Sequence, residues 1–316
     1  MRYVKVIAPS GSIAKLDKSD LVLAEEFYKK FDVEVLYSEH IGEIDEFYSS
    51  SIASRIEDLH GAFAEKNIGF IQIAAGGSNI NQLLPKIDFD LIKNNIKPIV
   101  GHSDATALLN AIYAQTNYMS YHGLHYKNLT NEVDLLFIEQ WLKRFLDGTN
   151  EWVNVLPSDF WWEKNLPRQK NEGFWALQDG EARGIIVGGN LPTLSLLQGT
   201  KYMPNLENKI LFLEYDGLVG EFVPEEFDRD LESLLQQQGT DKIQAIVFGR
   251  FTSNSTMDRE KLIRILHSKS IAKNIPMVAN VDFGHTKPMI IFPIGGECSL
   301  SVYEQNIDLK IKLFNN

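Results

Sequence analysis

The feature that most constrains the fold is an alternation of short β-rich runs with helical patterns from residue 1 to about 125. Strands that alternate with helices form βαβ units, in which parallel strands are covered by helices on both faces. We therefore expect an α/β fold with a Rossmann-like or flavodoxin-like N-terminal domain built on a parallel sheet. The expected strands are Val4–Ala8, Val33–Tyr37, Phe70–Ala75 and Ile96–Val100, and the expected helices are Asp20–Phe31, Ile52–Glu65, a stretch near Leu83–Asn94 and a helix after Ser103.

The second half of the chain is richer in strands, and 316 residues exceed the size at which one core usually keeps growing. A helix over Asp134–Leu146, followed by turn residues, places the end of the first domain at residue 150. Residues 151–175 form an aromatic loop or linker, and residues 176–316 form a β-rich mixed domain. Its expected strands are Gly184–Gly188, Ile210–Glu214, Ala245–Phe248, Met277–Val281, Met289–Pro293 and Ser299–Tyr303, with helices near Glu225–Gln238 and Arg259–Lys269.

Composition excludes several classes of partner. The formal net charge is −11 and the sequence has no basic run, which argues against binding to a nucleic-acid backbone. A single cysteine, Cys298, excludes an internal disulfide and a cysteine-based zinc site. No apolar stretch has the length of a signal-peptide core or a membrane span, so we expect a cytoplasmic protein that does not bind a membrane. The first βα turn, 9–12, lacks the dinucleotide fingerprint, and we expect no cofactor.

Ser103 lies at the junction between an expected strand and an expected helix. Small residues flank it at both second neighbours, Gly101 and Ala105, as a nucleophile elbow requires for strand and helix to pass closely. A serine at a helix start also commonly caps the free backbone N–H groups. The turn alone is therefore compatible with a nucleophile or with a helix cap.

A serine nucleophile needs a histidine base and an acid that orients it. His285 follows an expected strand in a loop flanked by glycine and proline, and Glu214 ends the apolar run 210–213. His102 is expected to form a wall of the site, because neighbouring side chains diverge on a turn. His122 and His125 have no third ligand at a recognisable spacing, so we favour hydrogen-bonded loop histidines there and expect no metal site.

Taken in order along the chain, these motifs resemble those of the LD-carboxypeptidase family of serine peptidases. The motifs are Gly76-Gly77, Gly101 to Thr106, Gly188 to Leu191, Leu211 to Glu214 and Phe283-Gly284-His285. The resemblance implies that Ser103 is the nucleophile, His285 the general base and Glu214 its orienting partner. It also implies an oxyanion hole from the N–H groups of Asp104 and Gly77, a flavodoxin-like first half, a β-rich second half and a homodimer.

The tryptophans of residues 159–175 are similar to the aromatic loop of the family's microcin C immunity branch. That branch cleaves the bond between an aminoacyl or peptidyl group and a nucleotide phosphoramidate. Trp161 or Trp162 would stack on a nucleobase, although tryptophans also fill domain interfaces, and we expect Trp175 to be structural.

Three hypotheses about function stand beside one another. The first is cleavage of an amide-type bond in an aminoacyl- or peptidyl-nucleotide, a small-molecule substrate. The second is an LD-carboxypeptidase that releases D-alanine from a murein tetrapeptide, with Arg250 as a possible cation for the free carboxylate. The third is a non-catalytic nucleotide-binding protein, which predicts a degraded triad position; none is degraded.

Overall fold

The structure is a computed structural model that describes residues 2–129, 135–163, 166–271 and 275–314. The chain divides into two compact units, Met1–Leu135 and Leu136–Asn316. The division falls at the start of helix α5 (Leu135–Asp147), whereas the sequence analysis placed this helix in the first domain. Each unit is described by itself below.

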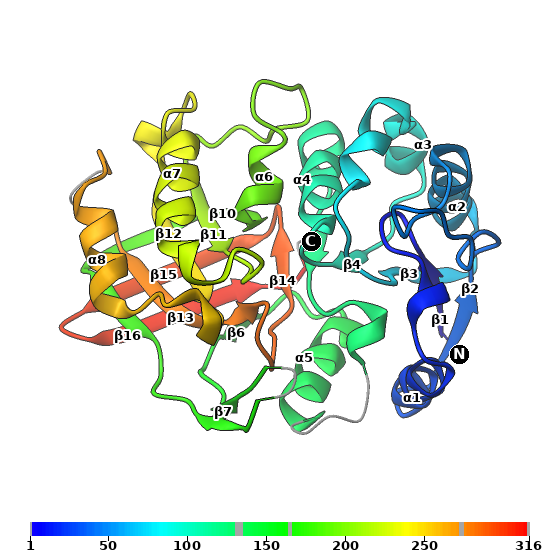
Figure 1. The fold of residues 1–316 in the computed structure, drawn as a ribbon, viewed down its shortest axis with the longest axis horizontal. Helices are drawn as coiled ribbons and strands as arrows, with labels where there is room; N and C mark the ends of the chain where they lie inside the picture. Colours follow the sequence, from blue (N-terminus) through cyan, green and yellow to red (C-terminus); the bar gives the residue numbers. More distant parts are fainter. Residues whose placement is uncertain (1, 130–134, 164–165, 272–274, 315–316) are drawn as a thin grey trace. The chain divides into compact units, whose positions relative to one another are not determined.

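The first unit contains a parallel sheet with the strand order β5-β4-β3-β1-β2 (Figure 1). Val4 of β1 pairs with Val35 on one side and with Phe70 on the other, and both partners are parallel. The central strands are almost wholly buried, which explains their continuous apolar character. The parallel α/β fold expected for the first half is confirmed. The strands are β1 (Arg2–Ile7), β2 (Val33–Tyr37), β3 (Ile68–Ile73), β4 (Ile99–Gly101) and β5 (Ser120–His122).

Helices connect the strands of the first unit. The expected helix near Leu83–Asn94 is instead two pieces. The 3₁₀ helix η2 contains Pro85 and stops one residue later, and Asp88 starts α3 by accepting a 2.8 Å hydrogen bond from the Leu91 N–H. Helix α4 is buried over most of its residues and follows directly after the Ser103 turn. The helices are η1 (Ile13–Lys15), α1 (Lys18–Lys29), α2 (Ile52–Ala64), η2 (Ile80–Lys86), α3 (Phe89–Asn94), α4 (Ala105–Thr116) and η3 (Tyr126–Asn128).

The second unit contains a mixed sheet with the strand order β6-β16-β15-β10-β11-β12-β13-β9 (Figure 1). Strands β10 to β13 are parallel, and antiparallel strands flank them on both sides. This confirms the expected mixed, strand-rich second half. The strands are β6 (Trp152–Asn154), β9 (Trp175–Gln178), β10 (Gly180–Asn190), β11 (Lys209–Glu214), β12 (Ala245–Arg250), β13 (Met277–Gly284), β15 (Glu297–Tyr303) and β16 (Asn306–Lys312).

Helix α7 of the second unit buries one face. In α7 the buried residues recur at helical spacing (Val223, Phe227, Leu231 and Leu234), so this helix turns a single apolar stripe inward. The expected strand near Met289–Pro293 is present as β14 (Phe292–Ile294), and two strands of the aromatic loop, β7 (Phe160–Trp161) and β8 (Gln169–Lys170), pair with each other. The helices are α5, α6 (Leu191–Ser195), η4 (Gly220–Phe222), α7 (Val223–Leu235), η5 (Thr240–Lys242), η6 (Ser253–Ser255) and α8 (Arg259–His267).

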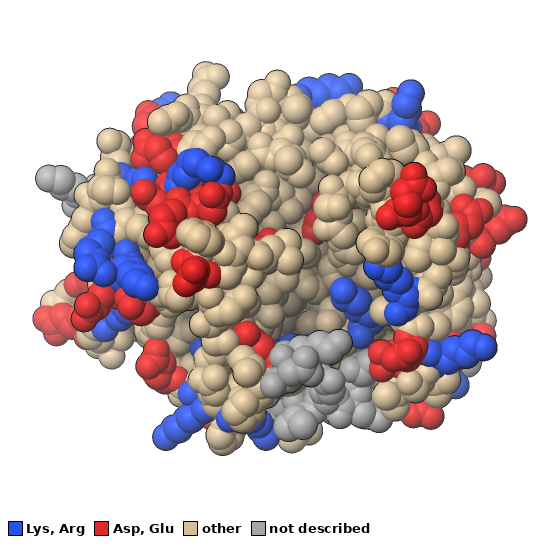
Figure 2. Space-filling model, in the orientation of Figure 1, with Lys and Arg blue, Asp and Glu red and all other residues tan. Residues whose placement is uncertain are grey.

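Two properties of the described residues bear on partners. No helix among them is long and apolar enough to cross a bilayer. Figure 2 shows lysine and arginine interspersed with aspartate and glutamate over the face in view, without a continuous basic stripe.

Candidate active site

Ser103 lies on a tight turn between the end of β4 and the start of α4. Its φ of 57° is in the left-handed region, which a non-glycine residue adopts only where the surroundings enforce it. A Cβ at Gly101 would lie 2.9 Å from Ile73 Cδ1 and 3.0 Å from Ala105 Cβ, so strand and helix pass as closely as the sequence predicted. The geometry is that of a nucleophile elbow.

The N-cap position of the helix after this turn belongs to the residue that follows Ser103. Asp104 holds the N-cap position of α4, and its side chain makes no capping hydrogen bond. Instead, Asp104 Oδ2 accepts hydrogen bonds from the Ser10 hydroxyl at 2.5 Å and from the N–H groups of Asn79 and Ile80 at 3.0 Å each. Burial raises the pKa of the Asp104 carboxyl, and these hydrogen bonds oppose that shift. The Asp104 carboxylate thus ties the loops after β1 and β3 to the serine turn.

Gly76 and Gly77 lie against this turn. A Cβ at Gly76 would lie 3.4 Å from Ser103 Oγ, which is a close contact, whereas one at Gly77 would lie 2.3 Å from Ser10 Oγ and would force a shift. Among the described residues, the N–H groups of Gly77 and Asp104 have no hydrogen-bond acceptor. Two unpartnered N–H groups beside a serine turn are the donors that an oxyanion hole requires.

The neighbouring histidines pack against one another. The rings of His102 and His125 are stacked, with centroids 3.9 Å apart, and the His102 N–H donates to His125 Nε2 at 3.3 Å. Within the described part of the chain, the group of three acidic or histidine side chains close enough to share a metal ion is Glu39, His40 and Glu57. That group does not include His122 or His125.

Glu214 and His285 meet in the second unit. Glu214 is the last residue of β11 and is 1% exposed, and its Oε2 lies 2.8 Å from Nδ1 of His285, which directly follows β13. Gly249 and Gly284 leave room for this carboxylate, since a Cβ on either would lie about 3 Å from Glu214 Cβ. Because a carboxylate accepts from Nδ1–H, Nε2 is left as the basic nitrogen.

The aromatic loop is attached to the same region. The backbone of Trp162 exchanges hydrogen bonds of 2.8 and 2.9 Å with Lys287, two residues after His285, and the Trp162 side chain is buried. Trp161 is half-buried, stacks over the Arg250 guanidinium at 5.2 Å, and lines a cavity of about 290 Å³. Trp161 therefore faces open space, whereas Trp162 belongs to the packing. Trp175 lines the same cavity, and its indole N–H donates to Glu172.

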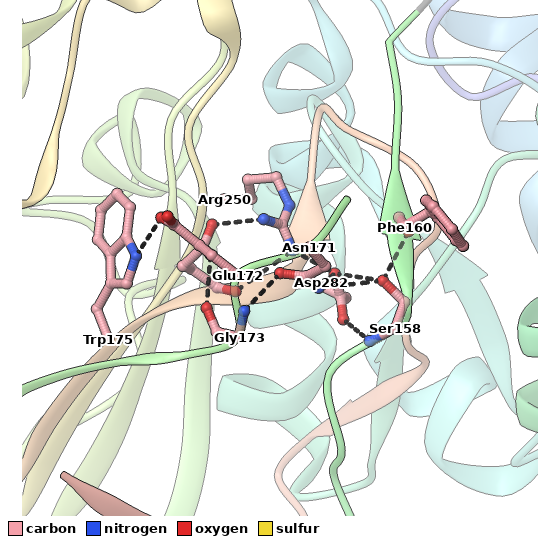
Figure 3. A network of polar contacts seen from close by, with 9 residues as sticks. Ser158, Phe160, Asn171, Glu172, Gly173, Trp175, Arg250 and Asp282 are labelled. Carbon is pink, nitrogen blue, oxygen red and sulfur yellow. Dashed lines mark hydrogen bonds and ion pairs between the residues drawn. The ribbon is translucent and has the colours of Figure 1, made fainter. Parts of the chain in front are cut away.

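Arg250, which the sequence offered as a cation for a substrate carboxylate, is held by a buried polar network (Figure 3). Arg250 donates to Asn280 Oδ1 and to Asp282 Oδ1, at 2.6 and 2.5 Å. Ser158 and Asn171, at two points of the aromatic loop, also donate to Asp282 (Figure 3). Burial raises the pKa of Asp282, and Arg250 counteracts the shift. Sequence reasoning missed Asp282, although an acid inside the apolar run of β13 was a visible signal.

The family of the chain follows from sequence comparison. Residues 4–123 match the model of the LD-carboxypeptidase N-terminal domain, and residues 183–300 match that of the LD-carboxypeptidase C-terminal domain. A candidate carboxypeptidase of Treponema pallidum is 38% identical over 316 residues, which cover 98% of this chain and 92% of that protein. The chain belongs to the LD-carboxypeptidase family.

Within the LD-carboxypeptidase family, the chain is similar to an MccF-like protein and to MccF itself. A crystal structure of an MccF-like protein from Bacillus anthracis has a TM-score of 0.96 and 39% identity, covering 99% of this chain and 97% of that one. The microcin C7 self-immunity protein MccF of Escherichia coli is 28% identical, with 90% of this chain and 86% of MccF covered. MccF has been solved in complex with aspartyl sulfamoyl adenosine, and that structure aligns with a TM-score of 0.84 at 25% identity over 98% of this chain and 96% of MccF.

Proposed function

We propose that this LD-carboxypeptidase family member is a metal-independent serine hydrolase of amide-type bonds, with Ser103, His285 and Glu214 as its triad. The contact between Glu214 and His285 carries the proposal. Burial of the Glu214 carboxylate costs solvation free energy, which packing alone does not account for. Its position 2.8 Å from the imidazole Nδ1 is the one that a catalytic acid needs to orient a histidine base. The left-handed Ser103 turn supplies the matching nucleophile.

The proposed reaction has two stages. Ser103 Oγ adds to the substrate carbonyl while His285 Nε2 takes the hydroxyl proton, and the oxyanion is received by the N–H groups of Gly77 and Asp104. The C–N bond then breaks, and the imidazolium returns the proton to the leaving nitrogen. Water, deprotonated by His285, attacks the acyl-enzyme, and release of the acid restores Ser103. Glu214 keeps the ring oriented and stabilises its positive charge.

We propose an aminoacyl- or peptidyl-nucleotide as the substrate. The similar protein MccF binds aspartyl sulfamoyl adenosine, an analogue of such a compound. In this chain, Trp161 offers an indole face beside a cavity, and stacking on a base contributes roughly 1 to 3 kcal/mol in nucleic-acid binders.

The second candidate substrate is a murein tetrapeptide, from which the enzyme would release the terminal D-alanine. The family models named for LD-carboxypeptidases favour it, since they match both halves of the chain. The two substrates share the scissile amide and differ in the leaving group.

A fluorophosphonate probe and the two substrates together test the proposal. We expect the probe to label Ser103 in the wild type, and labelling to be lost in Ser103→Ala and strongly reduced in His285→Ala. Turnover should fall by about 10³-fold or more in Ser103→Ala while the protein still binds substrate. Wild-type turnover in Ser103→Ala would disprove the mechanism, and binding without turnover in the wild type would favour the non-catalytic nucleotide-binding protein.

A further inference from the structure

A second cavity lies in the first unit, beside the serine turn. Its volume is about 290 Å³, and Gly76 forms part of its wall. The cavity wall comes close to the serine hydroxyl at this residue, since a Cβ on Gly76 would lie 3.4 Å from Ser103 Oγ. The walls come from the loops after β1 and β3, the segment around Tyr48, and Lys127.

The lining of this cavity has the chemistry of an anion site. Lys15 and Lys127 are both in the lining, which contains no carboxylate among the described residues. The Lys15 ammonium lies over the face of the Tyr48 ring, 2.7 Å from its centroid, which restricts where the charge can point.

Backbone donors add to this positive character. Within the described ranges, the N–H groups of Gly11 and Ser78, neither of which is assigned to the oxyanion hole, have no hydrogen-bond acceptor. Unpartnered N–H groups on a concave surface attract anions. The cavity therefore combines two ammonium groups with polar backbone hydrogens.

Hydrogen bonds of buried side chains join the walls of the cavity. The buried Arg55 donates from Nη1 to the carbonyl of Pro9 at 3.2 Å and to the Asn79 side chain at 3.0 Å, so that it links the two loops. Asp104 joins the same loops through Ser10 and Asn79. A preorganised site loses less entropy on binding than a mobile one.

We propose that this cavity binds the anionic group next to the scissile amide of the substrate. The inference rests on the proposed function and specifies its substrates. The two candidates share this chemistry. A phosphoramidate carries its negative charge on the oxygens of the phosphorus that is bonded to the scissile nitrogen, and a C-terminal D-alanine carries a carboxylate one atom further away. Arg250 does not serve this role, because its guanidinium is bound by Asp282 and Asn280.

The test compares charged substrates with neutral counterparts. One arm uses a murein tetrapeptide and its C-terminal carboxamide; the other uses an aminoacyl-nucleotide phosphoramidate and its neutral methyl ester. We expect Lys15→Met and Lys127→Met each to lower kcat/KM about 10-fold or more for the charged member, because a hydrogen bond to an ionised group is lost. The neutral member should change by less than about 2-fold, as for a surface substitution. The arm that shows the loss identifies the anion as carboxylate or phosphate.

Lys18→Met is the matched control, since Lys18 is also exposed and does not line the cavity. Equal losses on charged and neutral members, or no loss on either, would overturn the inference and leave the proposed hydrolase intact. If the wild type cleaves neither substrate, the proposed function fails, and calorimetry of AMP against adenosine decides the anion site separately. Tighter binding of AMP, abolished in the Lys15→Met/Lys127→Met double variant, would support the site. Equal wild-type affinities would refute it.

Discussion

Glycine and alanine neighbours leave the space that the residues of the proposed triad need. Gly101 and Ala105 allow the tight turn at Ser103, and Gly249 and Gly284 leave the space that the Glu214 carboxylate occupies. Glu214 Oε1 has no hydrogen-bond partner among the described residues, so this buried carboxylate is only half satisfied. An unsatisfied buried carboxylate oxygen costs stability, and such a cost is typical of a functional site.

Replacing Glu214 should therefore separate activity from stability. We expect Glu214→Gln to lower kcat by about 10³-fold or more, because the imidazole loses its orienting negative charge, with little change in KM. The melting temperature should stay level or rise, because a buried charge is removed. Steady-state kinetics and thermal unfolding measure the two effects. A large fall in melting temperature with unchanged kcat would contradict this role.

Asp104 should give the protein a distinctive pH dependence. Because burial raises its pKa, the folded protein binds a proton there more tightly than the unfolded chain does. Its contribution to the free energy of unfolding is thus fully present below the ordinary aspartate pKa of 3.8 and is lost as pH rises through the folded pKa. In denaturant unfolding, the free energy of unfolding of the wild type should fall relative to that of Asp104→Asn as pH rises. A difference that is independent of pH would contradict the shift.

At the scale of elements, the aromatic loop has distinct anchors. Trp162 pairs through its backbone with Lys287, Glu163 accepts hydrogen bonds from the N–H and hydroxyl of Ser253, and Asp282 binds Ser158 and Asn171. These contacts attach the loop to β13 and to the segment after His285. The aromatic loop is therefore held by hydrogen bonds as part of the second unit and is not a linker.

The two adjacent tryptophans should behave differently. We expect Trp161→Ala to raise KM for a nucleotide substrate about 5-fold or more, since a stacking face worth roughly 1 to 3 kcal/mol is lost, and to spare a small peptide substrate. Trp162→Ala should lower stability by about 3 kcal/mol or more, because a buried aromatic side chain is removed. Steady-state kinetics with both substrates and denaturant unfolding distinguish them; equal effects of Trp161→Ala on both substrates would argue for a structural role.

The sequence predicted the elements that are strongly periodic and failed where tertiary contacts decide. The parallel first half and the mixed second half follow from hydrophobic periodicity, and strand Val33–Tyr37 has the expected bounds. The break between η2 and α3 could have been predicted from Pro85 and from the capping residue Asp88, but the sequence analysis expected a single helix there. Arg250 could not be interpreted from sequence, because its partner Asp282 lies on the neighbouring strand and only the fold brings them together.

The whole molecule carries an excess of negative charge. The formal net charge is −11, and Figure 2 shows both signs interspersed on the face in view. Long-range repulsion from nucleic-acid phosphates should therefore exceed any local attraction. We expect no retention on duplex DNA at about 0.15 M salt, where the screening length is roughly 8 Å. Electrophoretic mobility shift measures this, and salt-sensitive binding would contradict the expectation.

The hydrogen bond between Glu214 and His285 lies entirely within one compact unit. Of the two contacts that a catalytic triad requires, the acid–base contact is thus set by the folding of that unit alone. The acid–base pair of the proposed triad therefore depends on the pairing of β11, β12 and β13 within the second unit, and on no residue of the first.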